Sequence, residues 1–289
     1  MNFSDQPVLM PCAGENLVGI LSQPEQPGSL GLVMVVGGPQ YRVGSHRQFV
    51  LLARCLASAG FPVLRFDHRG MGDSSGQRRP FDSIEDDIGV ALETLQRQCP
   101  SVQRVALWGL CDGASAALLY SGQRTDARVV GLCLLNPWVR SEATLARTHI
   151  KHYYIGRLLE WSFWRQLWKG EYEWRPSLAG FWQNLQALRS EPPSAETDSP
   201  FQQQMAMSLR HFPGQVLLLL SARDYTAKEF LECAQSDPAW RGLLRLPTLQ
   251  RVEIADADHT FSKAIWRAAA EQAVLDWLRR LEGSDTASL

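Results

Sequence analysis

The chain has 289 residues, with 29 Lys plus Arg, 30 Asp plus Glu and a formal net charge of −1. This balance excludes the basic surface of a general nucleic-acid binder, and a hydrophobic fraction of 45% excludes wholesale disorder. No apolar run approaches the ~20 residues of a membrane span, and residues 1–6 lack the pattern of a signal peptide. The six cysteines form no CxxC pair. We therefore expect a cytoplasmic protein without a zinc site.

Short apolar segments alternate with longer segments of helical periodicity. The expected strands, in chain order, cover residues 8–12, 17–22, 30–37, 62–66, 102–108, 129–135, 215–220 and 250–254. The expected helices cover residues 45–59, 83–98, 112–120 and 262–281. This alternation predicts an α/β fold with a mainly parallel sheet and helices on both faces.

The alternation breaks between residues 137 and 211, where no clear strand is present. This segment carries six of the ten tryptophans, and residues 137–190 hold eight Lys or Arg against four acids. We expect residues 1–136 and 212–289 to form the core and residues 137–211 to form a helical cap or lid. A basic, Trp-rich cap is suited to an acyl chain on an anionic carrier. A solvated amphipathic helix or a membrane-surface role are the alternatives.

The strongest local signal is the pentapeptide Gly109-Leu110-Cys111-Asp112-Gly113. It directly follows an expected buried strand and opens a helix of small residues. This is the pattern of a nucleophile elbow, a sharp strand-to-helix turn that exposes its central side chain. The helix N-terminus also favours a thiolate. Cys111 is therefore the predicted nucleophile, and the alternative is a buried cysteine in a tight turn.

A second match to the elbow pattern, Gly72-Asp73-Ser74-Ser75-Gly76, is rejected. The preceding strand is expected to end several residues earlier, and no helix begins at Ser74. The elbow geometry is therefore absent there.

A nucleophilic thiol needs a base, and the base needs a group that orients it. Asp224 and His259 follow the last two expected strands, in the chain order nucleophile, acid, histidine. The carboxyl ends of the strands are where sites form in open α/β sheets. Asp256, Asp258 and Asn136 are weaker alternatives for the acid position. The other histidines are expected to be surface or packing residues: His46, His68, His149, His152 and His211.

An oxyanion hole needs backbone N–H donors. We expect one from Asp112, which follows the nucleophile, and one from Gly38 in the loop after the strand at residues 30–37. Pro39 has no N–H group and cannot donate. The sequence contains no GxGxxG motif, no P-loop and no metal-ligand cluster, so no cofactor is expected.

The elbow, the late aspartate and the later histidine resemble the α/β-hydrolase superfamily over nearly the whole chain. Three strings, GGPQYRVGSHRQF from Gly37, FPVLRFDHRGMGDS from Phe61 and GLCDGASA from Gly109, resemble exosortase A system-associated hydrolase 1. This resemblance implies a cytoplasmic hydrolase linked to a bacterial exosortase and exopolysaccharide system. The chain departs from the commonest superfamily pattern in having cysteine in place of serine, and Val36 in place of a frequent loop histidine.

A cysteine nucleophile favours thioesters, enol-type lactones or acyl transfer, because a thiolate is readily expelled again from an unactivated ester adduct. Dienelactone hydrolase is a superfamily relative with this variant. We therefore expect a Cys-His-Asp hydrolase or thioesterase that acts on a small or carrier-bound acyl substrate. An acyltransferase, a non-catalytic binding protein and a redox thiol are the alternatives. The sequence does not specify the acyl group, the acceptor or the oligomeric state.

Overall fold

The computed structural model describes residues 2–38, 40–140 and 200–283. Its strands are β1 (Phe3–Cys12), β2 (Glu15–Pro24), β3 (Leu30–Val35), β4 (Val63–Asp67), β5 (Arg104–Leu110), β6 (Val129–Leu135), β7 (Gln215–Ser221) and β8 (Leu249–Ile254). The α-helices are α1 (Gln48–Ser58), α2 (Glu85–Gln98), α3 (Asp112–Gln123), α8 (Phe201–His211), α9 (Tyr225–Ser236) and α10 (Ala264–Gly283). Short 3-10 helices are η1 (Ser45–Arg47), η2 (Phe81–Ser83), η4 (Pro238–Trp240) and η5 (Leu243–Arg245).

The eight strands form one sheet in the order β1-β2-β4-β3-β5-β6-β7-β8. β1 and β2 form an antiparallel hairpin, and β2 pairs antiparallel with β4. All pairs from β4 to β8 are parallel. The predicted α/β fold with a mainly parallel sheet is confirmed, and the carboxyl ends of the parallel strands share one edge.

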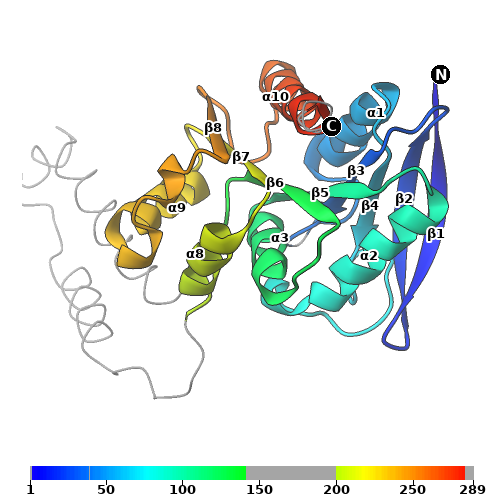
Figure 1. Ribbon diagram of the computed structural model, residues 1–289, viewed down its shortest axis with the longest axis horizontal. Helices are drawn as coiled ribbons and strands as arrows, with labels where there is room; N and C mark the ends of the chain where they lie inside the picture. Colours follow the sequence, from blue (N-terminus) through cyan, green and yellow to red (C-terminus); the bar gives the residue numbers. More distant parts are fainter. Residues whose placement is uncertain (1, 39, 141–199, 284–289) are drawn as a thin grey trace, which may run out of the picture. The chain divides into compact units, whose positions relative to one another are not determined.

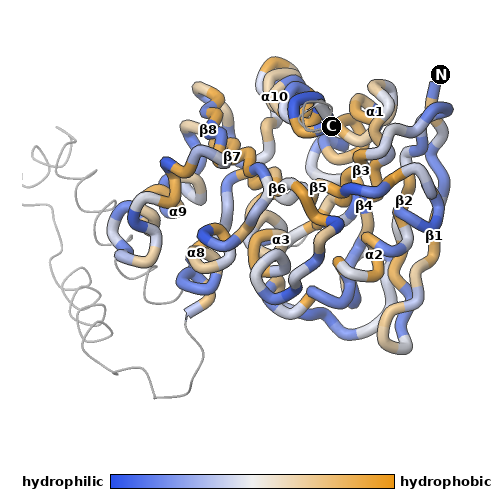
Figure 2. The backbone as a smooth tube through the Cα atoms, in the orientation of Figure 1, coloured by the Kyte–Doolittle hydropathy of each residue, from blue (hydrophilic) through white to orange (hydrophobic). Residues whose placement is uncertain are grey.

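The central strands are buried on both faces because successive side chains alternate between two cores. On β3, Val33 and Val35 join one hydrophobic cluster, and Leu32 and Met34 join the other. Trp108 of β5 belongs to the second cluster and meets the ring of Phe49 edge-on, with the ring centroids 5.1 Å apart. Figure 2 shows hydrophobic residues along much of this central sheet.

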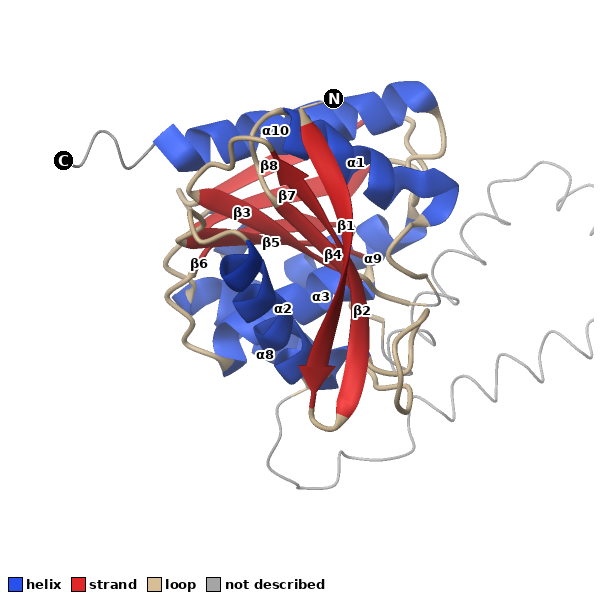
Figure 3. Cartoon of the chain, turned by 90° about the vertical axis from the view of Figure 1, so that its right-hand side faces the viewer, coloured by secondary structure: helices blue, strands red, loops and turns tan. Residues whose placement is uncertain are grey.

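Helices cover both faces of the sheet (Figures 1 and 3). α1 and α10 pack on one face and contribute Leu52, Leu56 and Leu278 to the second cluster. α2, α3 and α8 lie on the opposite face. α9 joins that layer through Phe230, which packs edge-on against Trp240 of η4.

Two helices differ from the sequence predictions. The helix expected at residues 45–59 begins as an α-helix only at Gln48, because Gly44, His46 and Arg47 all have positive φ angles. A Cβ atom at Gly44 would lie 2.6 Å from the ring of Phe49, so this turn needs glycine. α9 was not expected from the sequence.

Most of the expected cap, residues 141–199, lies outside the described residues. Its last part is α8, which packs against α3 in the same compact unit as the sheet. Met205 and Leu209 of α8 are buried in the core cluster, and this burial explains why the helix belongs with the core. Among the described helices, none has both the length and the apolar composition needed to cross a membrane.

A close backbone approach between β5 and α3 predicts an intolerance to added volume at Gly109. A Cβ atom there would lie 2.3 Å from the carbonyl oxygen of Gly113, within the backbone of the turn between β5 and α3. We expect Gly109→Ala to lower the free energy of unfolding by about 2 kcal/mol or more, measured by urea denaturation.

Gly89 in α2 provides the matched control. Its nearest contact would be Tyr120 Oη at 3.8 Å, an ordinary van der Waals distance. Gly89→Ala is expected to leave stability unchanged or to raise it by up to about 1 kcal/mol. Equal effects of the two substitutions would contradict the close approach at Gly109.

Candidate active site at the carboxyl ends of the strands

The residues predicted from the sequence as a site all follow strands at the same edge of the sheet. Gly38 follows β3, Cys111 follows β5, Asp224 follows β7 and His259 follows β8. Because these strands run parallel within one sheet, the fold brings together segments that are more than 200 residues apart in sequence.

Cys111 occupies a strained turn. Its backbone has φ 60° and ψ −126°, and α3 begins at the next residue. The Cys111 carbonyl oxygen accepts hydrogen bonds from the N–H groups of Ala114 at 3.0 Å and Trp138 at 3.2 Å. Its own N–H group donates to the carbonyl oxygen of Leu135 at 2.9 Å. These bonds hold a backbone conformation that L-residues rarely adopt, which is typical of a nucleophile elbow.

Asp224 and His259 form a hydrogen-bonded pair. His259 Nδ1 lies 2.7 Å from Asp224 Oδ2, and the two side chains are 31% and 7% exposed. The same carboxylate accepts the N–H groups of Thr226 at 3.1 Å and Ala227 at 3.4 Å, and so caps α9. The helix cap fixes the carboxylate, and the carboxylate fixes the imidazole.

The pKa of His259 reflects this environment. Burial acts to lower it, but hydrogen bonds to Asp224 and Cys111, together with the negative charges of both groups, raise the pKa of His259 to about 10. The imidazolium is therefore the favoured form at neutral pH. The two groups that raise the pKa of His259, Asp224 and Cys111, are both site residues predicted from the sequence. Since Nδ1 faces Asp224, Nε2 is the nitrogen left to face Cys111.

The alternative acids have other partners. Asp256 pairs with Arg223 at 2.9 Å on the surface, where both side chains are mostly exposed. Asp258 accepts the N–H and the hydroxyl of Ser262. Within the described residues, neither carboxylate bonds to His259, whereas that of Asp224 does.

Asn136 contributes to the site in a way that the sequence did not indicate. Its amide oxygen accepts the N–H of Ser221 at 2.8 Å, and its amide nitrogen donates to Ser221 Oγ at 3.0 Å. The same nitrogen donates to the carbonyl oxygen of His259 at 3.4 Å. The fully buried Asn136 thus joins the ends of β6 and β7 to the backbone of the candidate base. It acts as a positioning residue.

Ser74 has a structural role in this fold. Its hydroxyl donates to the carbonyl oxygen of Asp67 at 2.6 Å and accepts the N–H of Val18 at 2.8 Å. It ties the loop after β4 to β2, and no helix begins at this residue.

One of the two expected oxyanion donors, the Gly38 N–H, already donates to a side chain, and so does the N–H of Gly113, which was not an expected donor. The Gly38 N–H donates to Asp112 Oδ2 at 2.7 Å, and the Gly113 N–H donates to Oδ1 at 3.1 Å. Burial raises the pKa of Asp112, while the bonds from these N–H groups act to lower it. A Cβ atom at Gly37 would lie 2.0 Å from this carboxylate, so the glycine loop is shaped around it. Sequence reasoning considered only the backbone N–H of Asp112 and missed its carboxylate.

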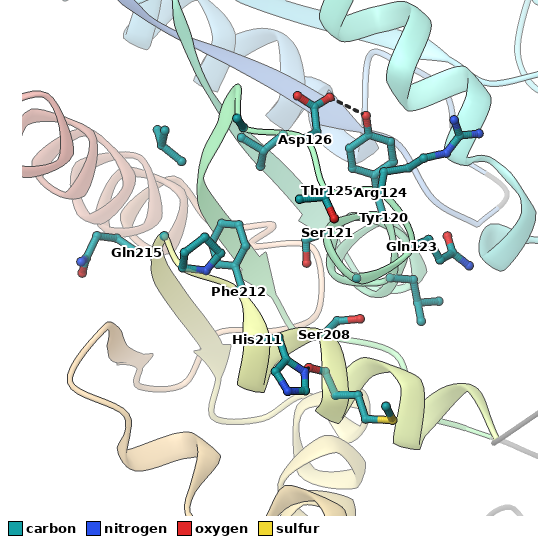
Figure 4. Close-up of a pocket in the computed structure, with 18 of the residues that line it drawn as sticks. Tyr120, Ser121, Gln123, Arg124, Thr125, Asp126, Ser208, His211, Phe212 and Gln215 are labelled. Atoms are coloured by element: carbon teal, nitrogen blue, oxygen red, sulfur yellow. Dashed lines mark hydrogen bonds between the residues drawn. The ribbon is translucent and has the colours of Figure 1, made fainter.

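Two cavities lie at opposite edges of the sheet. One, of about 370 Å³, is bordered by Gly38 and Asp112 beside the elbow. A larger one, of about 770 Å³, lies between the C-terminal part of α3 and α8 (Figure 4). Tyr120 there donates a hydrogen bond to Asp126 at 2.8 Å. Because its lining includes the first residues of β6 and β7, this cavity is remote from the candidate site.

Comparison with known proteins identifies relatives of this chain. A family model described as serine aminopeptidase, S33 (Hydrolase_4) matches residues 31–198, which is more than half of the chain. Human protein ABHD12B is 33% identical over 116 residues, covering 38% of this chain and 31% of the relative. An uncharacterized 31.7 kDa protein of Escherichia coli from the traX-finO intergenic region is 35% identical over 80 residues, 27% of each chain. The matches therefore span less than a third of these relatives.

Solved structures share the fold over almost their full length. The Pyrococcus furiosus esterase Pf2001 has a TM-score of 0.65 at 16% identity, covering 97% of this chain and 94% of that chain. A dienelactone hydrolase from Anabaena variabilis has a TM-score of 0.62 at 14% identity, covering 97% and 99%. Est1E from Butyrivibrio proteoclasticus, with ferulic acid bound, has a TM-score of 0.60 at 15% identity, covering 95% and 98%. At these identities the likeness shows the α/β-hydrolase fold.

The contact between Asp224 and His259 predicts a specific loss in Asp224→Asn. Asparagine is also a good helix cap, so stability should change little, but the charge that stabilises the imidazolium is removed. We expect kcat to fall about 100-fold or more, measured by steady-state hydrolysis of a thioester. Asp256→Asn removes only a surface ion pair and should leave kcat unchanged. A larger loss in Asp256→Asn would show that the acid is misassigned.

The raised pKa of His259 can be measured directly. We expect the ring to stay protonated through neutral pH and to titrate near pH 10, followed by NMR of its Cε1–H resonance. In Asp224→Asn and in Cys111→Ala the pKa should fall, because each variant removes a hydrogen bond and a negative charge. A wild-type midpoint near the ordinary value of about 6.5 would rule out the proposed charge arrangement.

Proposed function

Because the chain belongs to the Hydrolase_4 family of α/β-hydrolases, we propose that it cleaves acyl esters or thioesters through a covalent intermediate on Cys111. The observation that carries this proposal is the placement of Cys111 at a strained turn and of the Asp224–His259 pair, 2.7 Å apart, at the same edge of the sheet. A cysteine at a strained elbow, a base beside it and an acid behind the base are the three parts of a nucleophilic site.

In the proposed reaction, the Cys111 thiolate attacks the carbonyl carbon, and the carbonyl π electrons move to oxygen. The tetrahedral adduct collapses, the bond to the leaving group breaks, and the leaving group takes a proton from His259 Nε2. His259 then removes a proton from water, which attacks the thioester carbonyl. Collapse of the second adduct releases the carboxylic acid and restores the thiolate beside the imidazolium. Asp224 stabilises the imidazolium throughout.

The Asp112 carboxylate indicates where the oxyanion would bind. A carboxylate is itself an oxyanion, and in this structure it accepts the N–H of Gly38, the predicted donor. An adduct oxygen at the same position would displace it and receive hydrogen bonds from Gly38 and from the backbone of Asp112. The oxyanion role of these two residues is part of the proposal.

Thioesters are the preferred substrate class within this proposal. The Cys111 thiolate and the thiolate of the substrate are similarly good leaving groups, so the adduct on Cys111 proceeds forward as readily as it reverts. With an unactivated oxygen ester, Cys111 would be the better leaving group and the adduct would mostly revert. The fold likeness to an esterase and to a dienelactone hydrolase supports acyl chemistry of this general type.

Two related functions use the same residues. An acyltransferase would have the same acyl-enzyme, with an alcohol or amine in place of water. The sequence strings that resemble exosortase A system-associated hydrolase 1 favour an acyl substrate from an exopolysaccharide system, and this link also belongs to the proposal.

The proposal is tested by varying the nucleophile. We expect Cys111→Ala to abolish turnover of both a thioester and its matched oxygen ester. Cys111→Ser should lose most thioester activity but retain or gain activity on the oxygen ester, because its adduct no longer reverts by expelling thiolate. The measurement is kcat/KM for both substrates with all three proteins, combined with intact mass of the trapped acyl-enzyme. Wild-type turnover that survives Cys111→Ala would refute covalent catalysis at this residue.

A further inference from the structure

Two arginines in the loops after β3 and β4 are paired with carboxylates. Arg42 donates to Asp67 and pairs with Asp73 at 2.6 Å. Arg69 holds the fully buried Asp87 through two nitrogens, with its closest contact at 2.7 Å. These pairs neutralise the carboxylates of Asp67 and Asp87, both of which are fully buried.

Arg78 and Arg79 differ from Arg42 and Arg69 in having no carboxylate partner among the described residues. Within residues 2–38, 40–140 and 200–283, neither side chain has an ion pair or hydrogen bond, and both are exposed. The loop that presents them is nonetheless well held. Gly70 has φ +73°, and a Cβ atom there would lie 2.2 Å from the backbone nitrogen of Arg78. The chain before this point is tied down by the Gly70 N–H, which donates to Ser75 O at 3.0 Å. The backbone at Arg78, which precedes Arg79, therefore packs closely against Gly70.

Both arginines line the cavity of about 370 Å³ beside the elbow. The other lining residues are Gly38, His68, Pro80, Phe81 and Asp112. Burial lowers the pKa of His68, so this ring adds no charge at neutral pH. The Asp112 carboxylate is held by backbone N–H groups. The charged lining is therefore two arginines against one carboxylate, and its net charge is positive.

We propose that this cavity is an acyl subsite for a substrate whose acyl chain ends in a carboxylate, which binds Arg78 and Arg79. The substrate class is the monothioester or monoester of a short dicarboxylic acid. The inference rests on the proposed function, since it assigns the acyl group to the same site. Gly38 and Asp112 border the cavity, so a chain within it starts beside the N–H groups that would bind its carbonyl oxygen. The volume fits a small acyl group, and the planar guanidinium matches a carboxylate in two-point geometry.

The test compares two thioesters that have the same five-carbon chain. Pentanoyl and glutaryl N-acetylcysteamine differ only in whether the far end is a methyl group or a carboxylate. We expect the wild type to favour the glutaryl substrate in kcat/KM by about tenfold or more, measured by thiol release. The double variant Arg78→Gln/Arg79→Gln should lose this preference, because its kcat/KM for the glutaryl substrate falls to about its kcat/KM for the pentanoyl substrate.

Two further variants test whether the substrate preference depends on where the arginines lie and on the shape of the guanidinium group, as well as on positive charge. Arg241→Gln removes an exposed arginine between η4 and η5, outside this cavity, and should keep the preference. Arg78→Lys/Arg79→Lys keeps the positive charge but lacks the planar guanidinium group, so it should show only part of the wild-type preference for the glutaryl substrate. No preference in the wild type, or a preference that survives in the double glutamine variant, would overturn the subsite.

A second measurement does not depend on turnover. Glutarate should slow the alkylation of Cys111 by iodoacetamide in the wild type, whereas 1,5-pentanediol should not, and the double glutamine variant should lose the protection. If Cys111→Ala turns over the pentanoyl substrate as the wild type does, the proposed function fails. The protection of Cys111 by glutarate would then still show whether the cavity binds a carboxylate. Pentanoyl turnover that requires Cys111, without glutarate protection or glutaryl preference, leaves the function standing and removes the subsite.

Discussion

The close packing of β5, α3 and β3 around one turn is the constraint on which the site depends. A Cβ atom at Gly113 would lie 2.4 Å from the carbonyl oxygen of Val35, and one at Gly109 would meet Gly113 itself. The two glycines let the strand reverse directly into the helix, so Cys111 takes its left-handed backbone conformation. A larger residue at either glycine would push α3 away from the sheet, and the thiol would lose its position relative to His259.

Hydrogen bonds from side chains to the backbone then fix the neighbouring loops around this turn. Asp112 joins the glycine loop after β3 to the start of α3. Asn136 joins the ends of β6 and β7 to the backbone of His259. Asp224 caps α9 while it holds the imidazole. Each polar side chain is buried or nearly so, and each is satisfied by partners from a different loop. These bonds therefore connect the loops to one another and to the strand ends.

The sequence predicted a mainly parallel sheet and the strand-end positions of Cys111, Asp224 and His259, because these depend on local apolar runs and on turn residues. It did not predict the start of α1 at Gln48, since two consecutive left-handed residues leave no periodic signal. It also assigned α8 to the insertion, because a helix gives no local sign of which surface it packs against. The carboxylate of Asp112 on the Gly38 N–H depends on a contact between residues 74 positions apart, which no local pattern encodes.

The distribution of charge at the carboxyl edge explains why an anionic group is the expected ligand. Buried charges there are paired within the protein: Arg69 with Asp87, Arg42 with Asp67, and the His259 imidazolium with Asp224. Asp112 is satisfied by backbone N–H groups, which carry only partial charge. Unpaired buried charge would be costly, so these contacts are set when the chain folds. Arg78 and Arg79 remain exposed at the rim, where their charges cost little without a partner. Among the described residues of these loops, Arg47 is likewise exposed and unpaired, but Arg78 and Arg79 are the two arginines that line the cavity beside the elbow.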